Sequence, residues 1–377
     1  MSKTLQDYAT LINDTIQSNE INHYITTDNM CQNLGGIDTF KNINIPQGKV
    51  RSFQKDDILL SNIRLYFRKV YRAKQKGGCS SDVLVFRAKH IDSATLFAIL
   101  SSQIFTDYAC LCSQGSKMPR GNKTHMMDFK IPTINFTIAK IFNSIQNKIE
   151  NNHKINELLH KILELLYEQY FVRFDFLDEN NKPYQTSGGK MKFSKELNRL
   201  IPNGWSVRFL NHKIVSTYQP KTISKTLLNN SYSYSVYGGG GIIGRFTEYN
   251  HEQSEFIISC RGQCGISYLT LPKSWITGNA MVIRPTKSYT SKTYLYHTIK
   301  KYKLTNYITG SVQPQITRQN LSTMPILIPK RKILNKWNNI SSLLWNLIHN
   351  NMQSTQTLTA LRDFLLPLLL KQQVKPQ

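Results

Sequence analysis

Acidic residues and long apolar runs are both scarce in this sequence. Its 377 residues include 23 Asp and Glu against 48 Lys and Arg, which gives a formal net charge of +25. The most apolar stretch, residues 364–370, contains Pro367 and is far shorter than the roughly 18 residues that a membrane helix needs. We therefore expect no membrane-spanning segment and no membrane partner.

Cysteines and catalytic motifs are also sparse. Six cysteines are too few for a disulfide framework, and residues 1–20 lack the apolar core of a signal peptide, so we expect a cytoplasmic protein. The pairs Cys110/Cys112 and Cys260/Cys264 lack zinc-ligand spacing. No HExxH cluster, GxxxxGK(S/T) phosphate loop or NPPY-type methyltransferase tetrapeptide occurs. The sequence predicts neither a metal site nor a catalytic residue.

What the sequence has in excess is positive charge, and most of it lies in the second half. Residues 201–377 hold 21 basic and 4 acidic side chains, a net +17, whereas residues 1–200 have a net +8. Such an excess attracts polyanions, so it favours a nucleic-acid partner. A Lys-rich composition inherited from an AT-rich genome is the alternative. With 40% hydrophobic residues the chain can form globular cores, and its length indicates two domains.

The two halves of the sequence repeat one another at a nearly constant offset. Arg87 in LVFR parallels Arg284 in VIRP, and GSKMPRGN at residues 115–122 parallels GSVQPQIT at residues 310–317. Pro132 parallels Pro329, and the three offsets are 195 to 197 residues. A repeat of this kind predicts two related modules.

A long helix is predicted after each copy. Apolar residues recur at steps of three and four over residues 138–166 and again over 337–365, and each series has an Asn pair near its middle, at 151–152 and 350–351. This is the period of a helix that packs against another helix, and a buried Asn favours one register. We expect the two helices to pair antiparallel; the alternative is that each packs only on its own module.

The expected fold class is α+β, with two α/β modules in tandem, two long antiparallel coiled-coil helices and approximate two-fold symmetry. The predicted boundaries are residues 1–132 for the first module, 133–175 for the first helical region, 176–199 for a linker, 200–329 for the second module and 330–377 for the second helical region. Roughly 33 helical residues span about 50 Å, the length of about 15 base pairs. The helices could therefore act as a ruler between two unequal half-sites.

Several motifs bring a family into view. They include KDDILLSNIR (55–64), GGCSSDVLVFR (77–87), GSKMPRGN, the helical stretch at 147–171, IPNGW (201–205), YGGGGIIG (237–244), IISCRGQCG (257–265), ITGNAMVI (276–283) and GSVQPQIT. In this order the chain resembles the DNA-specificity subunit of Type I restriction-modification systems over nearly its entire length. It departs from the pattern before Leu5, where no IPNGW-like motif occurs, and in the second helix, where the NKIE-type signature is degraded to NLIHNN.

The resemblance implies a non-catalytic subunit with two target recognition domains and two conserved helical regions. It implies binding to double-stranded DNA at a bipartite, asymmetric target, and to DNA adenine methyltransferase (modification) subunits, expected to be two, and restriction/translocase subunits. S-adenosylmethionine, and ATP with Mg²⁺, would be bound by those partners and not by this chain. It places the protein in a bacterial or archaeal cytoplasm.

Basic and polar residues in four segments are the candidate DNA contacts. Arginine pairs with phosphate or guanine, and glutamine with adenine. The candidates are Arg64, Arg68 and Lys69; Lys117, Arg120 and Lys123 in the first loop; Tyr237, Arg245 and Arg261 at or near the glycine-rich segment; and Gln313, Gln315 and Arg318 in the second loop. The alternatives are a solvated strand face for the first group and turns that merely close each module for the loops.

Two other functions stay open. An orphan adenine methyltransferase, or another phage-defence complex without cleavage, would use the same kind of specificity subunit. A nuclease or RNA-processing enzyme would need clustered carboxylates for a metal, which the low acidity after residue 200 disfavours. The GxGxxG within YGGGGIIG is followed by RFTEYN and not by a helical pattern, so dinucleotide binding is not expected.

Overall fold

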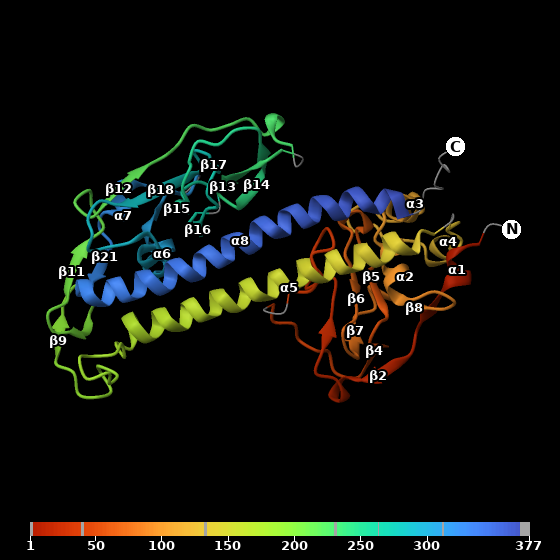
Figure 1. The fold of residues 1–377 in the computed structure, drawn as a ribbon, viewed down its shortest axis with the longest axis horizontal. Coiled ribbons are helices and arrows are strands. Elements are labelled where there is room, and N and C mark those ends of the chain that lie inside the picture. The colour runs from red at the N-terminus through yellow and green to blue at the C-terminus, as the bar shows by residue number, and fades with distance from the viewer. Residues whose placement is uncertain are drawn as a thin grey trace. The chain divides into compact units, whose positions relative to one another are not determined.

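The computed structural model describes residues 3–38, 41–131, 134–229, 232–262, 264–310 and 313–369 (Figure 1). The chain divides into two compact units, unit 1 with residues 1–155 and 351–377 and unit 2 with residues 156–350. Each combines β-sheets with helices, which confirms the predicted α+β class. The predicted boundary at 132/133 and the end of the second helical region beyond 369 lie outside the described residues.

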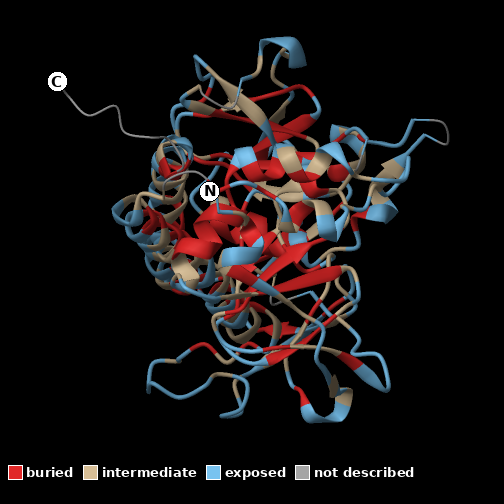
Figure 2. Cartoon of the chain, turned by 90° about the vertical axis from the view of Figure 1, so that its right-hand side faces the viewer, coloured by how far each residue is buried: buried red, intermediate tan, exposed pale blue. Residues whose placement is uncertain are grey.

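Unit 1 is built on a four-stranded antiparallel sheet. Its strand order is β1 (Ala9–Ile12), β8 (Val83–Ala88), β5 (Ile58–Ser61), β6 (Val70–Arg72). The strands form here because β5 and β8 each begin with three apolar residues, all of which are buried. Figure 2 shows the buried segments of the chain in red. Helix α2 (Ser93–Leu100) packs on this sheet, and Asp92 caps it by accepting a hydrogen bond from the Thr95 amide at 2.9 Å.

The remaining elements of unit 1 surround this core. A second sheet has the order β2 (Thr15–Gln17), β4 (Lys49–Phe53), β7 (Gly77–Cys79), β3 (Tyr24–Ile25). The other helices are α1 (Leu5–Tyr8), α3 (Gln103–Leu111) and α4 (Lys123–Met127). Among the described residues no single helix is long and apolar enough to span a membrane; α2 and α3 pass that test only as a pair, which is bent by 59°.

Unit 2 repeats the main sheet of unit 1. Its strand order is β12 (Val215–Tyr218), β18 (Ala280–Pro285), β15 (Phe256–Ser259), β16 (Ser267–Leu269), and helix α6 (Lys292–Lys300) packs on it. Ile58 is paired with Phe86 in unit 1, and Phe256 is paired with Ile283 in unit 2. Since these positions differ by 198 and 197 residues, the structure confirms the repeat inferred from the sequence.

An ion pair is repeated with the sheet. In unit 1 the Arg87 guanidinium donates to both oxygens of Asp57 at 2.8 Å. In unit 2 Arg284 donates to Glu255 at 2.6 Å. Each carboxylate is buried at the start of a strand, and each arginine extends from the neighbouring strand. The pair therefore satisfies a buried charge at equivalent points of both sheets.

Unit 2 contains further short elements. They are the hairpin β9 (Met191–Ser194) and β10 (Arg199–Pro202); β11 (Ser206–Phe209) with β21 (Pro325–Ile328); β14 (Gly241–Phe246), β13 (Tyr234–Gly238) and β17 (Trp275–Ile276); β19 (Ile308–Thr309) with β20 (Gln315–Ile316); and α7 (Arg318–Leu321). The predicted linker is thus partly ordered. It contains most of the β9–β10 hairpin. The ring of Phe176 stacks on that of Trp205, with centroids 5.3 Å apart, and this aromatic contact holds the linker against the rest of unit 2.

Two long helices contribute to both units. α5 (Phe136–Tyr167) ends in a π-helical turn over 168–172, and α8 (Arg331–Leu369) is the last described element. They pair antiparallel within each unit, as predicted. In unit 1 the buried Asn152 amide donates to Thr355 at 3.1 Å; in unit 2 His160 contacts Trp345, with ring centroids 5.0 Å apart.

Candidate nucleic-acid interface

In unit 1 the loop at residues 115–121 is closed by its own backbone. The amide of Gln114 donates to the carbonyl of Arg120 at 2.9 Å, and the amide of Arg120 donates back at 2.8 Å. Gly115 permits the turn because its φ is +103°. The loop is exposed at Lys117, and Lys123 is exposed at the first position of α4. The sequence-predicted loop therefore presents its basic side chains to solvent.

Arg64 is attached to this loop. Its amide donates to the Pro119 carbonyl at 2.9 Å, and its guanidinium donates to the Lys117 carbonyl at 3.1 Å. The neighbouring Ile63 forms a β-bridge with Arg120, whose guanidinium lies 3.0 Å from Asp82. The structure thus brings Arg64, Lys117 and Arg120 together on two adjoining segments.

Unit 2 repeats this arrangement with other side chains. Thr309 pairs with Gln315 to close the second loop, Gly310 has φ +89°, and Arg261 forms a β-bridge with Gln315. Arg261, Gln313, Gln315 and Arg318 are all exposed. Residues 311–312 lie outside the described residues. The two loops therefore share a backbone geometry but differ in their side chains. The loop of unit 1 presents Lys and Arg, and that of unit 2 presents two Gln and one Arg.

The glycine-rich segment adjoins the second loop. Residues 239–240 form the turn between β13 and β14, and a Cβ atom at Gly239 would lie 2.9 Å from the Arg261 carbonyl oxygen. A strand follows these glycines, so the phosphate-binding strand–turn–helix geometry is absent from this described segment. The Arg245 guanidinium donates to the Ser233 carbonyl at 3.0 Å, and burial lowers the pKa of Arg245.

Three of the predicted contacts have hydrogen-bond partners within the fold, and the prediction for the buried Tyr237 is corrected by the structure. Tyr237 is 3% exposed, its hydroxyl accepts a hydrogen bond from the Leu271 amide at 3.0 Å, and burial raises its pKa to about 12. Arg68 donates to the Ser101 carbonyl at 2.8 Å and Lys69 to the Thr27 carbonyl at 2.5 Å; burial lowers the pKa of both. Tyr237 is buried, so its hydroxyl requires an internal partner, whereas Arg68 and Lys69 are half-buried and each donates to a backbone carbonyl.

Arg64 and Arg68 have an unusual backbone conformation. Both are left-handed, with φ of +50° and +49°, which costs an L-residue roughly 1 kcal/mol or more. The equivalent positions of unit 2 are Gly262 and Gly265, which are also left-handed. The Arg68 guanidinium donates a hydrogen bond to the Ser101 carbonyl, which gives this arginine a structural role. The Arg64 guanidinium likewise donates to a carbonyl, that of Lys117, so this bond gives its side chain a structural role as well. Arg64 is half-buried beside the exposed loop, and its contact with DNA stays a prediction.

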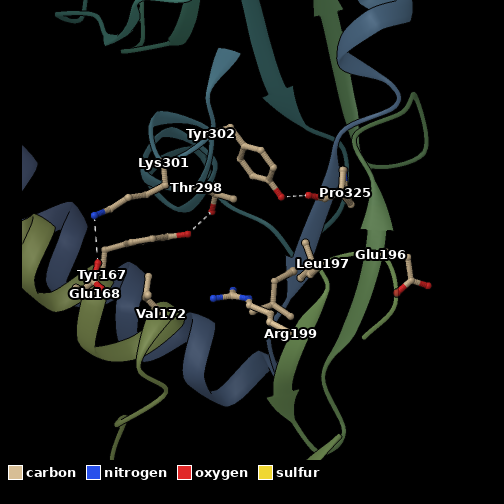
Figure 3. Close-up of a pocket in the computed structure, with 11 residues that line it drawn as sticks. Tyr167, Glu168, Val172, Glu196, Leu197, Arg199, Thr298, Lys301, Tyr302 and Pro325 are labelled. Carbon is tan, nitrogen blue, oxygen red and sulfur yellow. Dashed lines mark hydrogen bonds and ion pairs between the residues drawn. The ribbon is translucent and has the colours of Figure 1, made fainter. Parts of the chain in front are cut away.

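Two hollows in unit 2 contain residues that the sequence analysis missed. One of 490 Å³ adjoins Arg318 and is lined also by His212, Ser216 and Gln319. The other, of 510 Å³, lies at the end of α5 (Figure 3). There Lys301 pairs with Glu168 at 3.1 Å, and the Tyr167 hydroxyl donates to Thr298 at 3.0 Å. No sequence motif marks the second hollow, and at the first only Arg318 belongs to the predicted residues.

Metal binding finds no support in the described part of the chain, where no three His, Cys, Asp or Glu gather closely enough to hold an ion. Cys260 is buried and burial raises its pKa, whereas the Cys264 thiol donates to the Pro314 carbonyl at 3.1 Å. The Cys260/Cys264 pair therefore serves packing and a turn.

Comparisons with known proteins agree with the motifs. Residues 202–361 match the Type I restriction modification DNA specificity domain. The MjaIX Type I restriction enzyme specificity subunit of Methanocaldococcus jannaschii is 21% identical over 314 residues, which cover 74% of this chain and 68% of that protein. The crystal structure of the Type I restriction-modification S subunit from M. genitalium has the same fold, with a TM-score of 0.63 at 14% identity over 99% of this chain and 96% of that one. The resemblance predicted from the motifs is thus confirmed: the chain is similar to Type I specificity subunits, and its residues 202–361 match their DNA specificity domain.

Proposed function

We propose that this chain is the sequence-specific DNA-binding subunit of a Type I restriction-modification complex, with a bipartite and asymmetric target. The observation that carries the proposal is the repeated loop geometry, in which the Ile63–Arg120 bridge of unit 1 corresponds to the Arg261–Gln315 bridge of unit 2. Equal backbones favour two equivalent approaches to DNA, and unequal side chains favour two different half-sites. The helices α5 and α8 would set the gap between them.

In this proposal the chemistry belongs to partner subunits. Methyl transfer from S-adenosylmethionine to adenine would be carried out by two modification subunits, and ATP- and Mg²⁺-dependent translocation and cutting by restriction subunits. The complex would act in the cytoplasm. An orphan adenine methyltransferase would use the chain in the same way without cleavage, and only the presence of a restriction partner distinguishes the two.

The experiment that tests the proposal is expression of the chain with its cognate modification subunit, followed by mapping of methylated adenines across the genome. We expect a gapped motif with two unequal halves. A contiguous motif, or the absence of any motif, would contradict the proposal.

Loop variants should separate the two half-sites. Replacing Gln315 and Arg318 by Ala should relax one half of the motif and leave the other intact, since each lost base contact costs about 1–3 kcal/mol. Replacing Lys117 by Ala and Arg64 by Gly should relax or weaken only the other half. Glycine is the appropriate substitute because Gly262 occupies the equivalent left-handed position. The same mapping of methylated adenines reads both outcomes, and identical motifs for both double variants would remove the loops from the DNA-reading surface.

We propose that the modification subunit docks on an apolar face of unit 2. Exposed aliphatic residues recur at steps of three and four on both long helices, which is the pattern that accepts an amphipathic helix. Ser341 of α8 bonds with Thr293 of α6, and Glu164 of α5 pairs with Lys300 of α6, so the opposite sides of both helices face away from α6. The residues of the apolar face are Leu158, Ile162 and Leu165 on α5 and Ile340, Leu343 and Leu347 on α8.

Charge on this face should abolish docking. Ile162→Asp with Leu343→Asp should weaken association with the modification subunit by about 100-fold or more, because two aliphatic anchors are replaced by carboxylates that lose their hydration on binding. Leu227→Asp, which changes an exposed leucine in a short 3-10 helix of the same unit, is the matched control. Co-purification and titration calorimetry measure the effect. Unchanged affinity of the double variant would exclude this face.

A further inference from the structure

The hairpin of β13 and β14 ends in glycines and two isoleucines. Residues 238–241 are all glycine, and a Cβ atom at Gly240 would meet nothing within 4 Å. Gly240 is exposed, so the backbone at the centre of the turn is open to solvent without a side chain. The first side chains after it are Ile242 and Ile243, which are 49% and 39% exposed. Two adjacent aliphatic side chains therefore remain uncovered at the tip of a hairpin.

A β-bulge produces this exposure. Tyr237 pairs with Ile242, but the next residue, Val236, pairs with Gly244, so Ile243 is an extra residue in the ladder. In a regular strand neighbouring side chains alternate between faces, and one of the two isoleucines would turn toward the core. A bulge re-aims side chains, and bulges recur beside functional sites. The tip is therefore shaped to expose both isoleucines.

The hairpin tip lies within the candidate interface of unit 2. A Cβ atom at Gly239 would lie 2.9 Å from the Arg261 carbonyl oxygen, and Arg261 is bridged to Gln315 of the second loop. The surrounding half of the sequence has 21 basic and 4 acidic residues. A DNA duplex has anionic phosphates and apolar stacked bases. The basic side chains of this half can bind the phosphates, and the exposed isoleucines beside the glycine turn can contact the bases.

We infer that Ile242 and Ile243 form an apolar wedge that enters the duplex between two base pairs of the half-site read by unit 2. Wedges of Ile, Leu, Phe or Met partially unstack a base step and kink the DNA, at a cost of a few kcal/mol that the added contacts offset. The easily deformed pyrimidine–purine steps are the expected points of entry. This inference rests on the proposed DNA-binding function and adds a mode of recognition, by DNA deformability, to it.

The test uses the full-length chain and duplexes that carry the motif identified by mapping methylated adenines. The modification subunit is left out, because a methyltransferase would itself extrude a base. 2-Aminopurine is placed in turn at each step of both half-sites. Binding of the wild-type chain should raise its fluorescence several-fold at one step of one half-site. Ile242→Ser with Ile243→Ser should abolish the rise and weaken binding about tenfold per isoleucine.

Leu200→Ser, which removes an equally exposed leucine from β10, is the matched control and should leave the fluorescence and the affinity unchanged. Specific binding by the wild-type chain with no fluorescence change at any step would overturn the wedge and leave the DNA-binding function standing. An absence of specific binding would overturn the function itself. If the serine variant loses the modification subunit but distorts DNA normally, the isoleucines form a protein-docking surface and the wedge is wrong.

Discussion

Unit 2 is expected to lose about 4 kcal/mol of unfolding free energy when the pH falls from 7.5 to 5. The cause is a pair of buried histidines in the cluster formed by α5, α6 and α8. Burial lowers the pKa of His297 from 6.5 to about 3 and that of His349 to about 4. The positive charge of Lys300 further lowers the pKa of His297, and that of Lys292 further lowers the pKa of His349.

The direction follows from proton uptake by the two states. The unfolded chain binds protons at both histidines as the pH falls below about 6.5, whereas the folded chain keeps them neutral until the pH approaches 4 and then 3. Stability is therefore complete above about pH 6.5 and decreases below it. At pH 5 each histidine contributes about 2 kcal/mol of the loss. His160 and His251 in the same unit have pKa values lowered by burial and act in the same direction.

Tryptophan fluorescence measures this effect selectively. All four tryptophans (Trp205, Trp275, Trp337 and Trp345) lie in unit 2. Urea titrations followed by emission should give the pH dependence of that unit alone. His297→Phe should halve the loss, since the ring stacks on Tyr167 at 5.7 Å and no described residue bonds its Nε2. An unchanged pH dependence in this variant would show that His297 is already accessible to protons.

Arg87→Met should destabilise unit 1 by about 3–5 kcal/mol. The Asp57 side chain is 2% exposed, and the substitution leaves its carboxylate buried with only the Gln54 amide as a described partner, at 2.8 Å. The double variant Asp57→Asn with Arg87→Met should recover most of this loss, because the buried charge is removed together with its partner. Arg284→Met should cost less, because Glu255 and Arg284 are both more exposed than their counterparts.

Circular dichroism and tryptophan emission together locate this effect. For Arg87→Met, the unfolding transition seen by circular dichroism should begin at lower urea while the emission transition stays in place. A shift of both transitions by the same amount would mean that the units unfold as one body. A double variant as unstable as the single one would show that the loss comes from packing of the arginine stem and not from the stranded charge.

The sequence alone predicted the features that depend on periodicity and repetition. The offset between Arg87 and Arg284 located two equivalent strands, and the three- and four-residue steps located both long helices. The glycine- and proline-rich loops were also found, because Gly115 and Gly310 must adopt positive φ to close them. Such features are encoded locally, so a single sequence reveals them.

The sequence did not predict which polar side chains bond within the fold and which face solvent. Tyr237, Arg68 and Lys69 occur in segments that look like binding segments, yet long-range neighbours turn each of them inward. The left-handed backbone of Arg64 leaves no trace in composition, and only the alignment of Gly262 with it in the structure makes it visible. The bulge at Ile243 likewise depends on pairing between strands and not on the local sequence.

The division of the chain reverses the usual order of folding during synthesis. Unit 1 begins first, but its hydrophobic core includes Leu366 and Leu369 of α8, which the ribosome makes after all of unit 2. Unit 2 is a single continuous segment, residues 156–350, and all of it is translated before those two leucines. Domains usually mature from the N-terminus onward. Here unit 1 stays incomplete until unit 2 has been synthesised. A nascent chain that ends at residue 350 would therefore contain all of unit 2, but its unit 1 would lack the part of α8 that completes the core.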